Sequence, residues 1–196
     1  MNLKDAKKTS APVKPVKKSG NGKEPPVRLF YLLIAAFAFL LYGNTVKNRY
    51  SIDDFYVTAN NPVVEKGLKA IPEIFSSYYI NINAEEGGQH NYGYRPVAKA
   101  TFAIERQFLG DNPHFSHFIN VLLYALTGIL LFQLLRKLLK QYHVIFPLLA
   151  VVLFMAHPLH TEVVASLKNR EELLSFLGAL LALKFFLRYH ENGKWL

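Results

Sequence analysis

The sequence contains no cysteine among its 196 residues, so it has neither a disulfide framework nor a site that uses cysteine as ligand or nucleophile. It also lacks a glycine-rich phosphate loop, a dinucleotide fingerprint and the Ser-His-Asp order of known hydrolases. No internal repeat is found within its length. These absences make a soluble nucleotide a poor match as a substrate.

Acidic residues are also scarce, and the excess of bases is unevenly distributed. The formal net charge is +9, and residues 1–28 hold seven Lys and one Arg against Asp5 and Glu24. This stretch is rich in Pro, Lys, Ser and Gly and has almost no large apolar residue, which predicts disorder. A nucleic-acid-binding arm is one interpretation. We favour a basic cytoplasmic tail that orients the first membrane segment, with no nucleic acid as partner.

The remaining sequence is too apolar for an ordinary soluble domain. Hydrophobic residues make up 51% of the chain, and they occur in blocks separated by charged stretches. Since a spanning helix needs about 20 residues, we predict an all-α polytopic membrane protein with about four spans. The apolar segments are 27–46, 115–135, 144–156 and 173–187, and the last two are short enough to enter the membrane only partway. The domain prediction is a tail (1–28), a first span (29–46), an outer loop (47–114) and membrane helices two to four (115–196).

The charges between these segments indicate which links share a side of the membrane. The tail and the link 136–143 are basic, whereas 47–114 and 157–172 each carry a net charge of −1. The positive-inside rule therefore predicts a cytoplasmic N-terminus and places the acidic stretches outside. A bacterial inner membrane with these loops in the periplasm is our prediction. An endoplasmic-reticulum membrane would give the same sidedness.

The outer loop 47–114 is too long to be a simple connection. Asn61-Pro62 is typical of a helix start, and 96–108 is amphipathic, with Val97, Thr101, Ile104 and Phe108 on one face. Residues 81–94 are polar and glycine-bearing, which predicts a flexible segment. We expect a small helical cap without substantial strands.

Two adjacent carboxylates, Asp53 and Asp54, follow the first span. Like charges side by side repel, so one can be held protonated or both can share a cation. Such a carboxylate can act as a general base toward a hydroxyl. The structural alternative is that Asp53 caps a turn while Asp54 is solvated.

His157 and His160 are three residues apart, and Glu162 follows. On a helix the two histidines share a face, which suits a metal ion or an anionic headgroup. Zinc requires a further protein ligand, and none is clearly placed. We therefore assign no metal ligands and leave a divalent cation open as a cofactor. In the alternative interpretation the histidines simply end the third span.

Arg95 and Arg170 are candidates for holding a phosphate, since the guanidinium fork matches phosphoryl oxygens. Ion pairing with Glu171 or with acids of the outer loop is the competing interpretation. A lipid-linked phosphate at the membrane surface suits these residues better than a soluble nucleotide does.

The order of these motifs resembles the O-mannosyltransferase-like membrane proteins that carry tetratricopeptide repeats, within the GT-C class of glycosyltransferases. The resemblance covers about residues 50–190 and leaves out the basic tail. Its motifs are Ile52-Asp53-Asp54, Asn61-Pro62, Tyr94-Arg95-Pro96, His157-Pro158-x-His160-Thr161-Glu162 and Asn169-Arg170-x-Glu172-Leu173-Leu174.

The resemblance implies an inverting transfer of a sugar, here mannose, from a polyprenyl-phosphate carrier to protein hydroxyls on the extracytoplasmic side. It implies Asp53 as general base with Asp54 as its partner. It also implies that Arg95, His157, His160 and Arg170 offset the charge of the lipid phosphate, and that Glu162 orients a histidine. The bilayer, the sugar donor and the protein acceptor are the expected partners.

The chain is shorter than such enzymes, which have more spans. It is therefore either the N-terminal part of a longer protein or a short relative that works as a subunit of a membrane complex. A non-catalytic subunit that binds a partner or lipid through the same cap is the alternative function. A small transporter ranks last, because only Lys184 lies within a span.

Overall fold

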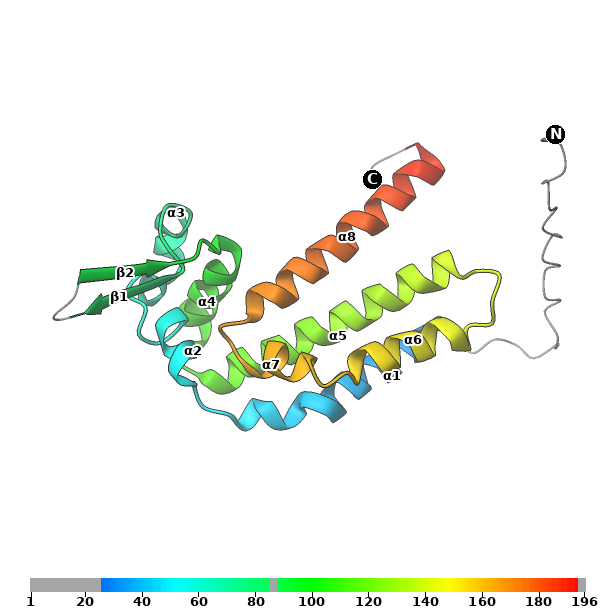
Figure 1. The fold of residues 1–196 in the computed structure, drawn as a ribbon, viewed down its shortest axis with the longest axis horizontal. Coiled ribbons are helices and arrows are strands. Elements are labelled where there is room, and N and C mark those ends of the chain that lie inside the picture. Colours follow the sequence, from blue (N-terminus) through cyan, green and yellow to red (C-terminus); the bar gives the residue numbers. More distant parts are fainter. Residues whose placement is uncertain (1–25, 85–87, 194–196) are drawn as a thin grey trace, which may run out of the picture.

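The helix α5 (Pro113–Leu138) runs through the centre of the molecule and contacts both of its parts. The computed structural model describes residues 26–84 and 88–193, without the side chains of residues 81–92 and 192. The other long helices lie along α5, and a cap made of residues 52–109 sits at its N-terminal end (Figure 1). Pro113 at the first turn and the Asn112 side chain, which accepts a hydrogen bond from the His114 amide, define where α5 begins.

Three of the described helices are long and apolar enough to cross a membrane by length and composition. They occupy Val27–Lys47, Pro113–Leu138 and Arg170–Glu191. The first combines α1 (Val27–Tyr42) with the 3-10 helix η1 (Gly43–Lys47), and the third is most of α8 (Arg170–Asn192). The chain is thus an integral membrane protein with an almost entirely helical fold, as the sequence predicted.

The predicted third span forms a broken path rather than one continuous helix. The helix α6 (Ile145–Met155) has 11 residues, or about 16 Å at the standard rise, against about 30 Å of hydrocarbon. The chain then turns at Pro158 and continues as α7 (His160–Ala165). Tyr124 of α5 donates its hydroxyl proton to the Met155 carbonyl at 2.9 Å, which satisfies a backbone group at the break.

A glycine allows α5 to approach two neighbours closely. A Cβ atom on Gly128 would lie 2.6 Å from Sδ of Met155 and 2.9 Å from Cγ2 of Ile34. These side chains belong to α6 and α1, and both are buried in the core of the bundle. Small residues at such a crossing let membrane helices pack backbone to backbone.

The cap contains more structure than the sequence predicted. Its elements are α2 (Ile52–Val57), η2 (Val64–Ala70), α3 (Ile71–Ile74), β1 (Ile80–Ala84), β2 (Gly88–Tyr92) and α4 (Pro96–Leu109). The expected flexible segment 81–94 is largely an antiparallel hairpin in which Ile80 pairs with Tyr92. The prediction of a cap without strands was therefore wrong in this segment, where paired backbone groups replace the expected loop.

The start of α1 and the buried face of α4 differ from what the sequence predicted. Helix α1 begins at Val27, two residues before the predicted first span, while residues 1–25 of the predicted tail lie outside the described part. In α4 the predicted apolar face is turned outward, with Phe108 71% exposed. The residues that α4 buries are instead Ala98, Lys99, Phe102, Ala103 and Glu105.

Candidate functional site

The candidate site forms where the cap meets the turn that precedes α8. This linking turn, residues 166–169, connects α7 to α8, and it contacts the cap through Asp54 and Tyr79. Tyr79 is buried and donates its hydroxyl proton to the Lys168 carbonyl at 2.9 Å. The turn thus brings the start of the Asn-Arg-x-Glu stretch to the acidic motif, whereas the His-Pro-x-His-Thr-Glu stretch lies before the turn, along the bundle.

Asp54 is buried, and its carboxylate fastens the linking turn to α2. Oδ2 accepts the amide proton of Ser51 at 3.0 Å and completes the capping box at the start of α2. Oδ1 accepts from the Lys168 amide at 2.9 Å and from the Ser166 hydroxyl at 3.3 Å. Both oxygens are therefore occupied by protein donors, so the capping role belongs to Asp54 and not to Asp53.

Asp53 has the opposite environment. Its side chain is 59% exposed, and Oδ2 lies 2.9 Å from Nζ of Lys168. This ion pair positions the carboxylate at the surface while its second oxygen, Oδ1, has no hydrogen-bond partner among the described residues. Of the two adjacent acids, Asp53 is the one that an approaching hydroxyl could reach.

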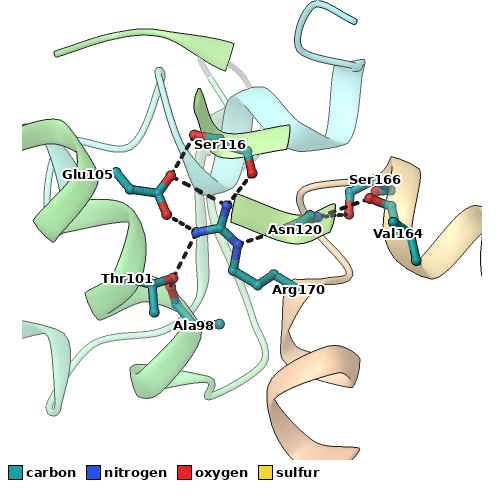
Figure 2. A network of polar contacts seen from close by, with 8 residues as sticks. All are labelled: Ala98, Thr101, Glu105, Ser116, Asn120, Val164, Ser166 and Arg170. Atoms are coloured by element: carbon teal, nitrogen blue, oxygen red, sulfur yellow. Dashed lines mark hydrogen bonds and ion pairs between the residues drawn. The ribbon is translucent and has the colours of Figure 1, made fainter. Parts of the chain in front are cut away.

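Arg170 is fully buried at the start of α8 and lies at the centre of a polar network (Figure 2). Its guanidinium forms an ion pair with Glu105 of α4 and donates to the Thr101 hydroxyl at 3.0 Å. It also donates to Oδ1 of Asn120 at 2.7 Å and to the Ser116 carbonyl at 2.9 Å, both in α5. A second bond to Glu105 brings the total to five, which equals the N–H donors of a guanidinium.

No donor of Arg170 is therefore left for a lipid phosphate, and the face of the guanidinium is covered as well. The Phe102 ring lies 4.1 Å from Cζ of Arg170, a cation–π distance. The structure gives Arg170 the role of joining α4, α5 and α8, and we do not carry it into the proposed substrate site.

The partners of Arg170 were not identified from the sequence, although one signal was available. Ser116 and Asn120 are spaced by four in an otherwise apolar segment, so they share one helix face. Polar groups in such a segment require partners inside the protein. Lys168 was counted only as a charge, and Glu105 gave no sequence signal of its own.

Arg95 lies beside Glu171 at the start of α8 and remains accessible. Its side chain is 40% exposed, and Nη1 lies 2.7 Å from the carboxylate of Glu171, the residue that follows Arg170. The Tyr79 ring lies 5.4 Å from Cζ of Arg95. Both predicted possibilities therefore coexist, because the guanidinium has an acidic partner and is also open to solvent.

A cavity of about 270 Å³ adjoins Arg95. Its wall combines Arg95 and Glu171 with the apolar side chains of Val97 and Leu174. Leu174 belongs to the first turns of α8, one of the candidate spans. The cavity therefore joins a charged group to an apolar surface at the start of a membrane helix.

The histidines of the predicted site lie deeper along the bundle. Tyr124 is 11 residues into α5, or about 16 Å from its start, and its ring centroid lies 5.7 Å from that of His160. His160 also packs on Phe154 at 4.4 Å, whereas His157 is exposed. No direct contact joins either histidine to Asp53 or Arg95 among the described residues.

Glu162 is exposed in the first turn of α7. No hydrogen bond connects it to His157 or His160 within the described ranges 26–84 and 88–193. The orienting role implied for Glu162 therefore stays a prediction that the structure does not support with a contact.

A metal ion finds no prepared set of ligands in the described part of the chain. No group of three His, Asp or Glu side chains lies close enough there to bind one. Asp54 has both oxygens occupied, so the adjacent acids offer only the open side of Asp53 to a cation. These residues do not fit a metal held by the acidic pair, and the open question of a divalent cofactor stays untested.

Comparison with known proteins points to one group of relatives. The chain is 31% identical over 161 residues to the protein O-mannosyl-transferase TMTC1 of Homo sapiens, covering 82% of this chain and 18% of that protein. It is 31% identical to Tmtc1 of Drosophila melanogaster and 32% identical to tmtc2 of Xenopus laevis, with 82% and 81% of this chain covered and 18% of each relative. No family model matches, and no solved structure is similar.

The resemblance seen in the motifs is thus confirmed over four fifths of the chain. The chain spans about a fifth of the length of these relatives, which carry the name of protein O-mannosyl-transferases.

Proposed function

We propose that this chain forms part of a glycosyltransferase that moves a sugar, mannose, from a polyprenyl-phosphate carrier to a protein hydroxyl. The observation that carries the proposal is the separation of two roles within the acidic motif. Asp54 is buried and fastens the linking turn to α2, which leaves Asp53 exposed beside it and paired with Lys168. The similarity to proteins named O-mannosyl-transferases supplies the reaction class.

Asp53 acts as the general base in this proposal. Its free Oδ1 accepts the proton of an acceptor serine or threonine hydroxyl, while Lys168 keeps the carboxylate in place through Oδ2. The hydroxyl oxygen forms a bond to the anomeric carbon, and the bond from that carbon to the phosphate oxygen breaks. The attack comes from the face opposite the leaving group, so the anomeric centre is inverted. General base catalysis of this kind contributes about 10²- to 10⁴-fold.

Arg95 receives the leaving phosphate. The polyprenyl phosphate departs with an additional negative charge, and a guanidinium close to it stabilises the transition state in which that charge develops. Glu171 holds Arg95 in the absence of donor, so the phosphate takes the place of Glu171 at Nη1. The apolar wall of the cavity, with Val97 and Leu174, suits the first units of a prenyl chain.

His157 and His160 remain proposed contacts to the lipid carrier. They lie at the break between α6 and α7, further along the bundle than the cap. The prenyl chain attached to the carrier phosphate can extend along the bundle at this level. The place of His160 next to Tyr124, with His157 beside it, favours a role along the path of the carrier rather than at the reacting carbon.

The reaction takes place on the extracytoplasmic side in this proposal. The tail 1–28 and the link 136–143 are both basic. The positive-inside rule therefore favours the cytoplasm as the location of the end of the bundle opposite the cap. A bacterial inner membrane stays our prediction for the compartment.

The experiment that tests the function is sugar transfer by purified full-length protein in detergent. It uses polyprenyl-phosphate mannose as donor and a library of Ser- and Thr-containing peptides as acceptors. We expect Asp53→Asn to lose at least about 100-fold in transfer. Glu65→Gln is the matched control, because Glu65 is an exposed acid of the same cap. Undiminished transfer by Asp53→Asn would remove Asp53 from the base role.

A non-catalytic membrane subunit is the second candidate function. The observation that favours it is that two of the predicted site residues, Asp54 and Arg170, are occupied by internal contacts. Absence of transfer by the unmodified protein, together with retained binding of the polyprenyl phosphate, would support the subunit and contradict the enzyme.

A further inference from the structure

A second cavity lies at the end of the bundle opposite the cap. Its volume is about 720 Å³, and it is formed where α1 begins, α5 ends and α6 begins. Gln133 lines it and is 20 residues after Pro113, which places it about 30 Å along α5 from the cap. That distance matches the hydrocarbon thickness of a bilayer. The cavity therefore sits at the opposite membrane boundary from Asp53 and Arg95.

The lining of this cavity, called the basic cavity below, carries a net positive charge. Arg136, Lys137 and Lys140 contribute to its wall, and none of the described residues that line it is acidic. Lys137 forms an ion pair with Glu191 of α8 at 2.7 Å. Arg136 and Lys140 have no ion-pair partner among the described residues, so their charges are available to an anion.

Neutral hydrogen-bonding groups complete the lining. Tyr31 of α1 and Tyr142 in the link after α5 both contribute. The side-chain oxygen of Gln133 accepts a hydrogen bond from Lys184 of α8 at 2.6 Å, which leaves its amide NH₂ as a donor. The combination of two uncompensated bases with hydroxyl and amide groups matches the oxygens of a phosphate.

The surrounding walls are apolar. Val27, Val144 and Pro147 line the same cavity. The helices that form it also direct large apolar side chains outward, with Leu32 of α1 67% exposed and Phe146 of α6 55% exposed. The acyl chains of a lipid whose headgroup occupies the cavity would therefore contact apolar helix surface outside it. A free phosphate has no acyl chain and makes no such contact.

We propose that the basic cavity binds the phosphate headgroup of an anionic membrane lipid. Basic pockets between membrane helices at a cytoplasmic boundary are a general way of holding such headgroups. This site is distinct from the proposed sugar-transfer site, because it lies at the other end of the bundle and shares no residue with it.

The test measures retention of phosphatidylglycerol by the full-length protein in nanodiscs. The discs contain phosphatidylcholine with or without one fifth phosphatidylglycerol, and the lipid that remains after extraction into detergent is quantified by native mass spectrometry. Inorganic phosphate and glycerol 3-phosphate are added to separate samples as soluble competitors. The variant is Arg136→Gln with Lys140→Gln.

The control is Lys47→Gln with Lys69→Gln, which removes two exposed bases nearer the cap. Each base near an anionic surface contributes about a five-fold gain in binding, so we expect about 25-fold weaker retention in the cavity variant. The control should retain the lipid as the unmodified protein does. The melting temperature of each variant in phosphatidylcholine alone establishes that its fold is intact.

Equal retention by the cavity variant and the control would overturn the site. Full displacement of the lipid by millimolar glycerol 3-phosphate would overturn the assignment to a membrane lipid. Neither result bears on sugar transfer, because the transfer assay compares variants of Asp53 and the retention assay compares variants of Arg136 and Lys140.

Discussion

Arg170 at the start of α8 and Glu105 in α4 form an ion pair in which the Arg170 side chain is fully buried and that of Glu105 is 9% exposed. The pair joins the cap to a membrane helix at a point 65 residues further along the chain. A buried charge that loses its partner is far more costly than an exposed one, which makes this pair a sensitive position.

Replacing Arg170 with Gln should therefore destabilise the protein strongly. Removing one partner of a buried pair costs about 3–5 kcal/mol, and the carboxylate of Glu105 would be left with the Ser116 hydroxyl alone. The measurement is thermal unfolding in detergent followed by circular dichroism. Lys66→Ala serves as the control, since its pair with Glu73 is exposed and such pairs contribute at most about 1 kcal/mol. Similar losses in both variants would contradict the role of the buried pair.

The two adjacent acids should respond differently to the same change. Asp54→Asn loses a charged acceptor for two backbone amides, and such a loss costs about 1–3 kcal/mol. Asp53→Asn should leave the free energy of unfolding within about 0.5 kcal/mol, as surface substitutions do. Denaturant unfolding of both variants checks this expectation. A larger loss in Asp53→Asn than in Asp54→Asn would reverse the assignment of roles.

Gly128→Leu should separate α5 from its neighbours. Even a Cβ atom there would lie within 3.0 Å of Met155 and Ile34, and overpacking a core typically costs about 1–3 kcal/mol. Gly178→Leu in α8 is the control, because no atom lies within 4 Å of its Cβ position. Thermal unfolding compares the two variants. A Gly128 variant as stable as the Gly178 variant would show that the crossing is looser than the structure has it.

The cap should become more stable as the pH rises above about 8. Burial lowers the pKa of Lys99 from 10.5 to about 8 in the folded protein. Between these values the unfolded chain binds a proton that the folded protein has released, so the free energy of unfolding rises with pH. Below about pH 8 both states are protonated and this group contributes no slope.

Lys99→Met isolates this effect. The variant should lose the rise in melting temperature between pH 8 and 9.5 that the unmodified protein shows. Burial raises the pKa of Tyr50 and of Tyr79, so neither titrates in the folded cap within this range. An identical pH dependence in the variant would assign the effect to another group.

The pattern of apolar blocks predicted the bundle well, because a helix that crosses a membrane must be both long and apolar. All four segments are helical, while the sidedness inferred from the charges between them stays a prediction. The break at Pro158 agrees with the alternative in which the histidines end the third span, since proline disfavours helix at the residue before it. The bond from Tyr124 to the Met155 carbonyl at this break could not be predicted, because it comes from another helix. The hairpin at 80–92 was missed although its first strand, Ile80–Ala84, alternates apolar and polar residues, because the partner strand Gly88–Tyr92 is polar and begins with glycine.

The sequence could not predict how the candidate site residues divide between buried and exposed positions. The sequence shows that Asp53 and Asp54 are adjacent, but the contacts of Asp54 with Ser166 and Lys168, more than 100 residues later, distinguish the buried acid from the exposed one. In the same way Arg95 and Arg170 look equivalent along the chain. Their difference comes from Glu105 and Asn120, which approach Arg170 from helices that precede it by many residues.

The long reach of these contacts has a consequence for the order in which the protein is made. Residues 52–109 are synthesised before the linking turn, yet Asp54 bonds to a residue 114 positions later and Glu105 to one 65 positions later. A nascent cap therefore lacks these two contacts until Lys168 and Arg170 have been synthesised. Closure of the cap must wait for the linking turn and the start of α8.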